Sequence, residues 1–290
     1  MKKISISSWA IPQEMHTLCK GAKEMGFDGI SLGGFPPYGA NPDLLDTDKK
    51  IEDYKRAFIE NGLEVADFAI DVWSYDALTQ TDEWRKAFTR QLKFVKKFGL
   101  TDIVRFDTDS KPKLPDGMTY EQVKEFYIKN FKEMAKEAAK LGLKLVWEFE
   151  PGFIINEPSN IIEVCKKVDE PNFKLLFDTC HAYNCSLGLN GIEPEVLDGG
   201  IMEFIEKAKG LIGWVHVIDA DGTLNHDNTS EHVPFGEGKI DFDQVIPALM
   251  DVGGFEGDWW SIDLCEWPDA WGVTEKCKKY VDQFNKKYCK

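Results

Sequence analysis

Short apolar runs and longer helix-like segments alternate along the entire chain, and this alternation constrains the fold more than any other feature. Eight such strand–helix units follow one another at intervals of roughly 30–45 residues, a spacing typical of parallel strands joined by helices. The expected strands are residues 4–9, 29–32, 64–70, 102–106, 143–149, 173–178, 213–218 and 259–264. Eight units are what a closed barrel requires, so the sequence predicts an α/β fold, a (β/α)8 TIM barrel that forms one domain over residues 1–290.

Local signals mark where the intervening helices begin and end. Thr119 and Gln122 form a capping-box pattern at one start, and glycines such as Gly62 and Gly99 follow the last turns of others. The alternative of an open, doubly wound sheet is disfavoured, because no glycine-rich fingerprint follows the first strand. The expected helices are residues 12–25, 47–62, 81–98, 119–141, 159–168, 195–209, 242–252 and 274–287.

Charge and cysteine usage exclude several classes of protein. The chain has 50 acidic and 35 basic residues, a net charge of −15, which repels a phosphate backbone, so we expect no nucleic-acid partner. Seven cysteines occur without a CxxC pair, which argues against a disulfide framework or a structural zinc site. No run of about 18 apolar residues is present, so no membrane partner is expected either. These features together indicate a reducing, cytoplasmic location.

Polar residues are concentrated at the predicted carboxyl ends of four consecutive strands. These strand ends carry Glu148 (with Glu150 two residues on), Asp178, His216 and Asp263. The active site of such a barrel lies at this end. Three carboxylates and an imidazole would be costly to bury together without a cation between them. The pattern therefore predicts one divalent metal ion, and the residue types are compatible with Mn²⁺, Mg²⁺, Co²⁺ or Zn²⁺.

Each of these residues also has a purely structural interpretation. Asp178 can cap the turn that follows its strand, Glu148 can pair with Arg105 on the preceding strand, and His216 can be a neutral core histidine. We favour the metal site because the four candidate ligands occupy equivalent positions on successive strands.

Several stretches resemble a known family. Residues 145–152, 176–181, 213–219, 232–242 and 255–263 are similar to the sugar phosphate isomerase/epimerase family of xylose-isomerase-like TIM barrels. The resemblance follows the order of elements over the whole chain and is specific in its second half. It implies a single xylose-isomerase-like TIM barrel domain over residues 1–290, with a metal held by Glu148, Asp178, His216 and Asp263, as in the ketose 3-epimerase branch. It also implies that Glu148 and Asp263 move the proton and that His181 contacts substrate.

Asp263 departs from that branch, which has a glutamate at this position. The aspartate side chain is one methylene shorter, which draws the carboxylate back by roughly 1.3 Å. It can still bind a metal ion, but its reach to a substrate carbon is in question. Glu266, three residues further on, is an alternative acid or base. A non-catalytic sugar-binding relative is the interpretation that this departure leaves open.

Other residues near the strand ends are expected to contact substrate: Glu150, Arg105, His232 and Trp9. Glu150 can equally hold a metal-binding side chain in position without contacting the metal itself. His232 can instead shape its loop or bind an additional metal, as the matching histidine does in the related endonuclease IV branch. Trp73, Trp267 and Trp271 either wall a sugar pocket or pack in the core. Residues 236–239 form either a phosphate-cradling turn or a plain turn into the next helix.

The resemblance and the residues together predict a divalent-metal-dependent isomerase or epimerase of a small sugar or cyclitol. The reaction would be proton transfer α to a carbonyl through a metal-stabilised enediolate. A keto-inositol dehydratase acting at the same site is the alternative within this class. An endonuclease is disfavoured by the five histidines and the net charge of −15. The expected partner is the small-molecule substrate, and the sequence is compatible with a homo-oligomer.

Overall fold

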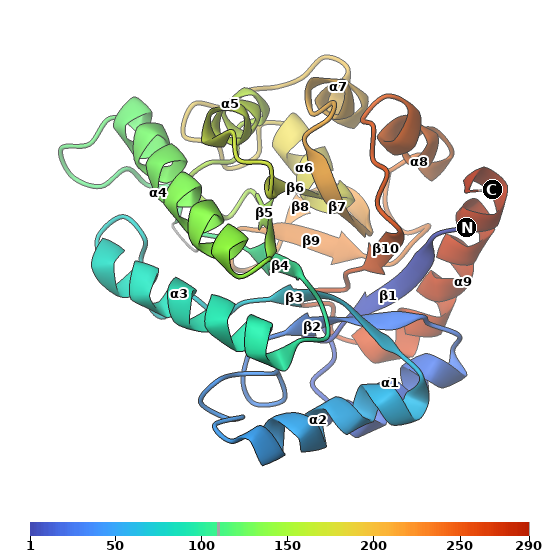
Figure 1. Cartoon of the computed structure of the whole chain (residues 1–290). Helices are drawn as coiled ribbons and strands as arrows, with labels where there is room; N and C mark the ends of the chain where they lie inside the picture. The colour runs from blue at the N-terminus through green and yellow to red at the C-terminus, as the bar shows by residue number, and fades with distance from the viewer. Residues whose placement is uncertain (109–110, 290) are drawn as a thin grey trace.

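The structure, a computed structural model, describes residues 1–108 and 111–289. Its eight parallel strands close into one barrel in the order β1-β10-β7-β6-β5-β4-β3-β2 (Figure 1). The barrel strands are β1 (Lys3–Ser7), β2 (Gly29–Gly33), β3 (Glu64–Ala69), β4 (Ile103–Phe106), β5 (Lys144–Glu148), β6 (Phe173–Asp178), β7 (Ile212–Val217) and β10 (Trp259–Ile262). The predicted single-domain (β/α)8 TIM barrel is therefore confirmed.

A ring of helices surrounds these strands (Figure 1). They are α1 (Met15–Glu24), α2 (Asp48–Asn61), α3 (Thr81–Phe98), α4 (Tyr120–Lys140), α5 (Pro158–Val168), α7 (Gly200–Lys207), α8 (Phe242–Asp251) and α9 (Ala270–Tyr288). The capping box of Thr119 and Gln122 forms at the start of α4, as predicted. Gly62 and Gly99 adopt positive φ angles of 60° and 71° after α2 and α3, where glycine carries no steric penalty.

Two features of the region after β6 differ from the predictions. A short helix, α6 (Thr179–Ser186), follows β6 directly, and the predicted helix at residues 195–209 is the shorter α7. Residues 219–239, predicted as a loop, contain a hairpin of β8 (Asp219–Leu224) and β9 (Ser230–Val233). Helix α6 lacks an amphipathic pattern because nearly all of it is buried, partly beneath this hairpin.

The barrel interior is layered along its axis. A cluster of Ala66, Val146, Leu176, Trp214 and Trp259 fills one layer. Alternate residues of a strand share a face, so the residues two positions further along β5, β6 and β7 also point inward, one layer nearer the carboxyl ends. The apolar layer thus supports a polar layer at the end where barrel active sites lie.

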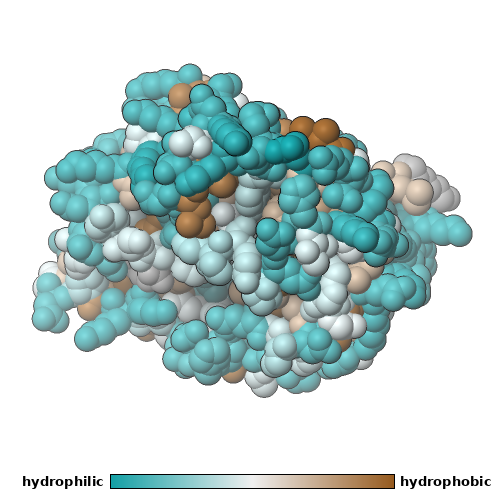
Figure 2. All heavy atoms as spheres, turned by 90° about the horizontal axis from the view of Figure 1, so that it is seen from below, coloured by the Kyte–Doolittle hydropathy of each residue, from teal (hydrophilic) through white to brown (hydrophobic). Residues whose placement is uncertain are grey.

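Many of the 50 acidic and 35 basic side chains of the chain are exposed, among them the acidic and basic partners of surface ion pairs. Figure 2 shows one face on which hydrophilic residues predominate and hydrophobic residues are scattered in small groups. Within the described part of the chain, no helix combines the length and the apolar character needed to span a membrane.

Candidate metal centre and cavity

The four predicted ligands lie together at the carboxyl end of the barrel. Glu148 and Asp178 are the last residues of β5 and β6, His216 is the penultimate residue of β7, and Asp263 directly follows β10. All four are buried, with at most 2% of any residue exposed. One donor atom from each lies within 4.8 Å of those of the others. The predicted convergence of Glu148, Asp178, His216 and Asp263 is thus observed.

Several donor atoms of this cluster have no partner of their own. His216 Nδ1 lies 3.0 Å from Glu148 Oε1, 3.4 Å from Asp263 Oδ2 and 3.8 Å from Asp178 Oδ2. Even so, Glu148 Oε1, Asp178 Oδ2 and both His216 nitrogens lack a hydrogen bond within the described residues. Buried polar atoms without partners are costly. Carboxylate oxygens and an imidazole nitrogen that converge in this way fit one divalent cation.

The second oxygen of each carboxylate is fixed by the protein. Glu148 Oε2 pairs with the guanidinium group of Arg105. Asp178 Oδ1 accepts the backbone N–H groups of Cys180 and His181, in the first turn of α6, at 2.7 and 2.9 Å. Asp263 Oδ1 accepts a backbone N–H at 3.0 Å, and the indole N–H of Trp9 is shared between both carboxylate oxygens of Asp263, at 3.1 and 3.2 Å. The structural roles considered for Asp178 and Glu148 are therefore real, but each uses only one oxygen and leaves the other for the cluster.

The electrostatics of the cluster favour a positive charge. Burial opposes protonation of His216, yet the neighbouring Glu148 and Asp263 raise its pKa well above the usual value. Burial raises the pKa of Asp178 to about 6. Burial also opposes ionisation of Glu148, but the charges of Arg105 and His216 outweigh it and lower the pKa of Glu148. A proton on His216 is the charge that a metal ion would displace on binding.

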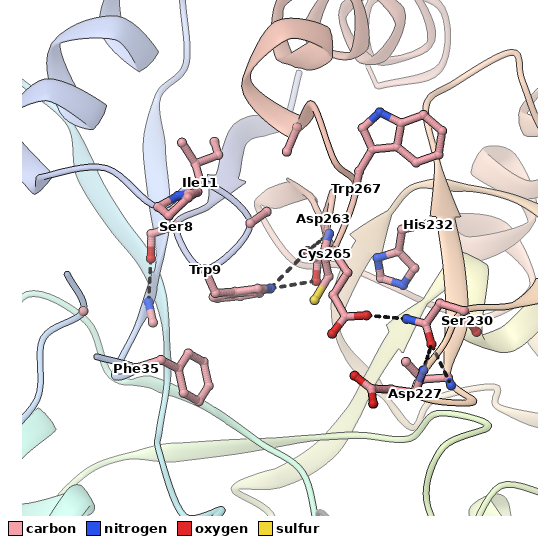
Figure 3. A pocket seen from close by; sticks show the side chains of 18 of the residues that line it. Ser8, Trp9, Ile11, Phe35, Asp227, Ser230, His232, Asp263, Cys265 and Trp267 are labelled. Atoms are coloured by element: carbon pink, nitrogen blue, oxygen red, sulfur yellow. Dashed lines mark hydrogen bonds between the residues drawn. The ribbon is translucent and has the colours of Figure 1, made fainter. Parts of the chain in front are cut away.

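A cavity of about 870 Å³ adjoins this cluster. Of the four candidate ligands, Asp263 lines the cavity, while the other three are fully buried, each with a donor atom within 4.8 Å of one of Asp263. Figure 3 shows the Trp9 indole nitrogen directed at Asp263. All the predicted substrate contacts also line this cavity: His181, Glu150, Arg105, His232 and Trp9. The tryptophans at positions 73, 267 and 271 line it as well.

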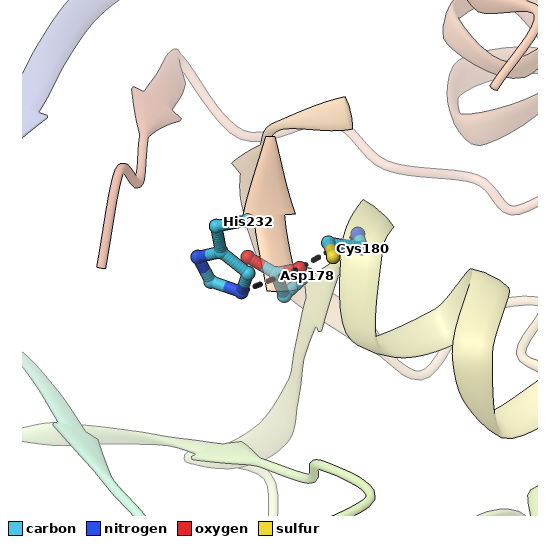
Figure 4. A group of neighbouring side chains, drawn as sticks. All are labelled: Asp178, Cys180 and His232. Carbon is cyan, nitrogen blue, oxygen red and sulfur yellow. Dashed lines mark hydrogen bonds and ion pairs between the residues drawn. The ribbon is translucent and has the colours of Figure 1, made fainter. Parts of the chain in front are cut away.

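His181 and His232 lie side by side on the polar side of the cavity. Their ring centroids are 4.8 Å apart, and neither His232 nitrogen has a hydrogen-bond partner in the described structure. Burial lowers the pKa of His181 to about 3, so its ring is neutral. His232 Nε2 lies 4.0 Å from Asp178 Oδ1, near Cys180 (Figure 4). Asp178, Cys180 and His232 form a second group of possible metal ligands. Burial raises the pKa of the Cys180 thiol well above its usual value, which disfavours a metal ion at this second group.

Glu150 differs from Glu148 in its protonation. Burial, reinforced by the charge of Asp107, raises the pKa of Glu150 well above its usual value. Its Oε2 accepts a hydrogen bond from the Thr229 hydroxyl, and it lies 3.9 Å from His181 Nε2. Burial thus favours the protonated form of Glu150, which lines the cavity.

The turn at residues 236–239 is occupied by a side chain of the protein itself. The Asp219 carboxylate accepts the backbone N–H groups of Gly236, Gly238 and Ile240 at 3.0–3.1 Å. A Cβ atom at Gly238 would lie 2.2 Å from Asp219 Oδ1, so this approach requires glycine. Of the two interpretations, the plain turn is correct, because these N–H groups are already satisfied and do not cradle a phosphate.

Glu266 lies apart from the four buried ligands. Its exposed side chain lines the same cavity and pairs with Asn225, in the turn between β8 and β9. It groups with His226 and Asp227, which are also exposed, rather than with the buried ligands.

A buried polar network near the cluster was not predicted from the sequence. Asp67 on β3 is fully buried and accepts a hydrogen bond from Ser31, which contacts Ser5 and Ser261 through their hydroxyl groups at 3.1 Å. Burial raises the pKa of Asp67 to about 6. The available signal was a lone aspartate in the apolar run of the third predicted strand.

The model of the xylose isomerase-like TIM barrel family matches residues 19–274. The chain belongs to this family. Among curated members, an uncharacterized protein of Methanocaldococcus jannaschii is 30% identical over 172 residues, 57% of this chain and 53% of the relative. A 2-oxo-tetronate isomerase of Haemophilus influenzae is 22% identical over 145 residues, 48% of each chain. An inosose dehydratase of Bacillus licheniformis is 24% identical over 288 residues, 89% of this chain and 84% of the enzyme. The chain spans about half the length of the first two.

Solved structures similar to this xylose isomerase-like barrel support the fold. An IOLI protein with a bound zinc atom has a TM-score of 0.75 and 19% identity, covering 99% of both chains. A D-psicose 3-epimerase from Clostridium cellulolyticum H10, solved with D-tagatose, has a TM-score of 0.72 and 17% identity, covering 99% of both. A family protein from Mycobacterium smegmatis in complex with magnesium has a TM-score of 0.71 and 16% identity, covering 98% of this chain and 96% of the other.

Proposed function

We propose that this protein is a divalent-metal-dependent isomerase or epimerase of a small sugar or cyclitol that moves a proton α to a carbonyl. The observation that carries the proposal is the convergence of unpartnered, buried donor atoms of Glu148, Asp178 and His216 beside Asp263, which faces a ligand-sized cavity. Similarity to enzymes named as isomerase and 3-epimerase supports the reaction class.

Glu148, Asp178, His216 and Asp263 would hold the metal ion. Mn²⁺, Mg²⁺, Co²⁺ and Zn²⁺ all suit this donor set, and similar structures with zinc and with magnesium support the assignment. When bound, the cation would polarise the substrate carbonyl and offset the negative charge that develops on its oxygen.

We assign proton transfer to Asp263 and Glu148. Asp263 faces the cavity, and although burial opposes its ionisation, contact with His216 lowers its pKa, so it is an ionised carboxylate that can accept a proton. The Trp9 indole N–H holds it in place. Glu148 is the second proton-transfer group, oriented by Arg105 from behind.

The remaining predicted residues would bind the hydroxyl groups of the substrate. Glu150, when protonated, donates a hydrogen bond, the neutral ring of His181 accepts or donates one, and the ring of His232 has both nitrogens without a partner in the described structure. Arg105 has a supporting role, since its guanidinium is already paired with Glu148 and lies 3.3 Å from Asp107.

A dehydratase acting on a keto-inositol is the second candidate. The similarity to inosose dehydratase, which extends over most of both chains, favours it. The reaction shares the first proton transfer and then expels a hydroxyl group, which needs an acid. Protonated Glu150 is placed on the cavity to supply that proton.

Solvent-deuterium exchange tests both candidates. Protein stripped with chelator and reloaded with Mn²⁺ is incubated in heavy water with panels of ketoses and keto-inositols. Deuterium at a carbon next to the carbonyl, dependent on metal, supports the proposal, and loss of water identifies the dehydratase. Glu148→Gln should abolish exchange even at Mn²⁺ concentrations high enough to saturate its weakened metal site. Metal-independent exchange, exchange with none of these compounds, or full activity of this variant would overturn the proposal.

A further inference from the structure

The lining of the cavity differs in chemistry along the chain. The carboxylates and histidines come from β5 and the segments after it, together with further aromatic rings, whereas the loops after β1, β2 and β3 contribute aromatic rings but no charged side chain among the described lining residues. These rings belong to Trp9, Phe35, Tyr38 and Trp73, and the last three form what we call the aromatic wall. The proposed reaction uses the carboxylates, the histidines and Trp9, and it leaves the aromatic wall without a role.

The aromatic wall presents flat apolar faces next to the cavity. The Phe35 and Trp73 rings lie 4.9 Å apart at an interplanar angle of 31°, and Phe35 meets Trp9 edge-on at 6.4 Å. Figure 3 shows Phe35 below Trp9, on the same side of the pocket. Trp73 is 45% exposed and Tyr38 is 42% exposed. Exposed aromatic rings that are grouped at a cavity, unlike singly scattered ones, are typical of ligand-binding sites.

The wall is also held rigid. The Gly39 N–H donates to the Phe35 carbonyl at 2.8 Å, and the next N–H donates to the Gly33 carbonyl at 3.0 Å. A Cβ atom at Gly39 would lie 2.3 Å from the Phe35 carbonyl, so the loop closes this tightly because the residue is glycine. The Trp73 indole N–H donates to Asp107. A preformed surface of this kind binds flat groups without an ordering cost.

Charge at the cavity disfavours an anionic ligand. Among the described lining residues, five are carboxylic acids and two, Arg105 and Lys111, are cationic. Arg105 is already paired with Glu148, and Lys111 is exposed at the rim. The turn that might hold a phosphate is filled by Asp219. The ligand that fits this environment is neutral.

The cavity exceeds what a single sugar ring needs. Its volume of about 870 Å³ is near the top of the roughly 300–1,000 Å³ typical of sites that enclose drug-sized ligands. A free monosaccharide over Asp263 would leave the aromatic wall in contact with water.

We propose that the substrate is a neutral glycoside, whose sugar ring lies over Asp263 and whose flat, apolar aglycone stacks on the aromatic wall. This inference rests on the proposed function. Because the anomeric carbon of a glycoside carries the aglycone, the carbonyl lies on another ring carbon. The step breaks one C–H bond next to that carbonyl and forms one again, so it needs no oxidant or reductant, and the glycosidic bond stays intact.

Calorimetric binding to the Mn²⁺-loaded protein tests the aglycone site without requiring turnover. The probes are phenyl and methyl α-glucosides, β-glucosides and β-galactosides, with the free sugars and their 6-phosphates. A phenyl glycoside should bind about tenfold more tightly than its methyl counterpart in at least one pair. The absence of a phenyl preference in every pair, or tighter binding of a free sugar or a phosphate, would overturn the inference.

Two matched variants locate the preference. Phe35→Leu keeps apolar volume but removes a flat ring, and it should reduce the phenyl-over-methyl ratio severalfold. Tyr38→Phe keeps the ring and should retain the ratio. Thermal melts confirm that both variants fold, and Trp73→Ala, at an exposed position, provides a third test of the ratio. An unchanged ratio in both Phe35→Leu and Trp73→Ala would contradict the proposed stacking site.

Deuterium exchange separates this inference from the proposed function. Hexosides oxidised at ring carbon 2, 3 or 4 are compared with the corresponding free keto-sugars. Exchange into the phenyl glycosides at a kcat/KM at least tenfold higher supports a glycoside substrate. Equal exchange into free sugars overturns the glycoside inference while the proposed function stands. If neither the oxidised phenyl glycosides nor the free keto-sugars exchange, while phenyl glycosides still bind selectively, the proposed function is overturned and the aglycone site stands.

Discussion

Replacing Asp178 by asparagine separates the two roles that this side chain performs. Oδ1 accepts two backbone N–H groups at the start of α6, and Oδ2 points into the ligand cluster without a partner. The asparagine carbonyl can still cap the helix, but the amide group directs N–H bonds, instead of a negative charge, at the metal position. We therefore expect Asp178→Asn to fold normally and to bind divalent cations weakly.

The size of the effect follows from the spacing of the charges. At an effective dielectric constant of about 20, a dication roughly 3 Å from a carboxylate charge is stabilised by about 11 kcal/mol. Removing the charge also relieves repulsion with Glu148 and Asp263, about 3.5 kcal/mol each if the charges are separated by the 4.8 Å limit of the cluster. The difference of about 4 kcal/mol corresponds to roughly a thousandfold loss of metal affinity.

Isothermal titration of chelator-treated protein with Mn²⁺ and Zn²⁺ measures this loss, and thermal melts of the metal-free forms provide the control. Asp178→Ala removes the cap as well, so its metal-free form should be about 1 kcal/mol less stable than that of Asp178→Asn. Binding of metal by Asp178→Asn with the affinity of the wild type would refute the role of Oδ2 as a ligand.

Three further predictions concern stability. Asp219→Ala leaves the N–H groups of the 236–240 turn unpaired and should cost about 3 kcal/mol in urea unfolding; a loss below 1 kcal/mol would contradict this bonding. Burial raises the pKa of Asp67 to about 6, so between about pH 4 and 6 the folded metal-free protein holds a proton on Asp67 that the unfolded chain has lost. The free energy of unfolding should therefore fall as the pH rises through this range. Asp67→Asn should remove about 3 kcal/mol of this fall, and a variant whose stability depends on pH as the wild type does would contradict this role of Asp67. Gly39→Ala places a Cβ atom against the Phe35 carbonyl, so it should lower the free energy of unfolding by about 1–3 kcal/mol and weaken the binding of phenyl glycosides. Wild-type stability together with wild-type binding would contradict a rigid aromatic wall.

Local sequence signals were sufficient for the regular part of the fold. Helix α3 has the bounds predicted from the apolar pattern and Gly99, and α4 begins at the predicted capping box. The period of two along the fifth predicted strand also placed Glu148 and Glu150 on the same face. These features depend on neighbours along the chain, so a single sequence contains them.

Features that depend on tertiary contacts were not predictable in the same way. Seven of the eight residues of α6 are buried, so its sequence has no polar stripe to reveal a helix. The Asp219 carboxylate finds its partners about 20 residues away, in a turn that could equally have bound phosphate. Which oxygen of Glu148 faces Arg105 and which faces His216 is fixed by neighbouring strands, and residue type alone does not specify it.

The central claim is that Glu148, Asp178, His216 and Asp263 hold one divalent cation beside the cavity. Anomalous diffraction from crystals soaked in Mn²⁺, recorded on both sides of the manganese absorption edge, tests it most directly. The account predicts one strong peak in contact with a donor atom of each of these four side chains. A peak between His181 and His232 instead, or no peak among the four residues at saturating Mn²⁺, would contradict it.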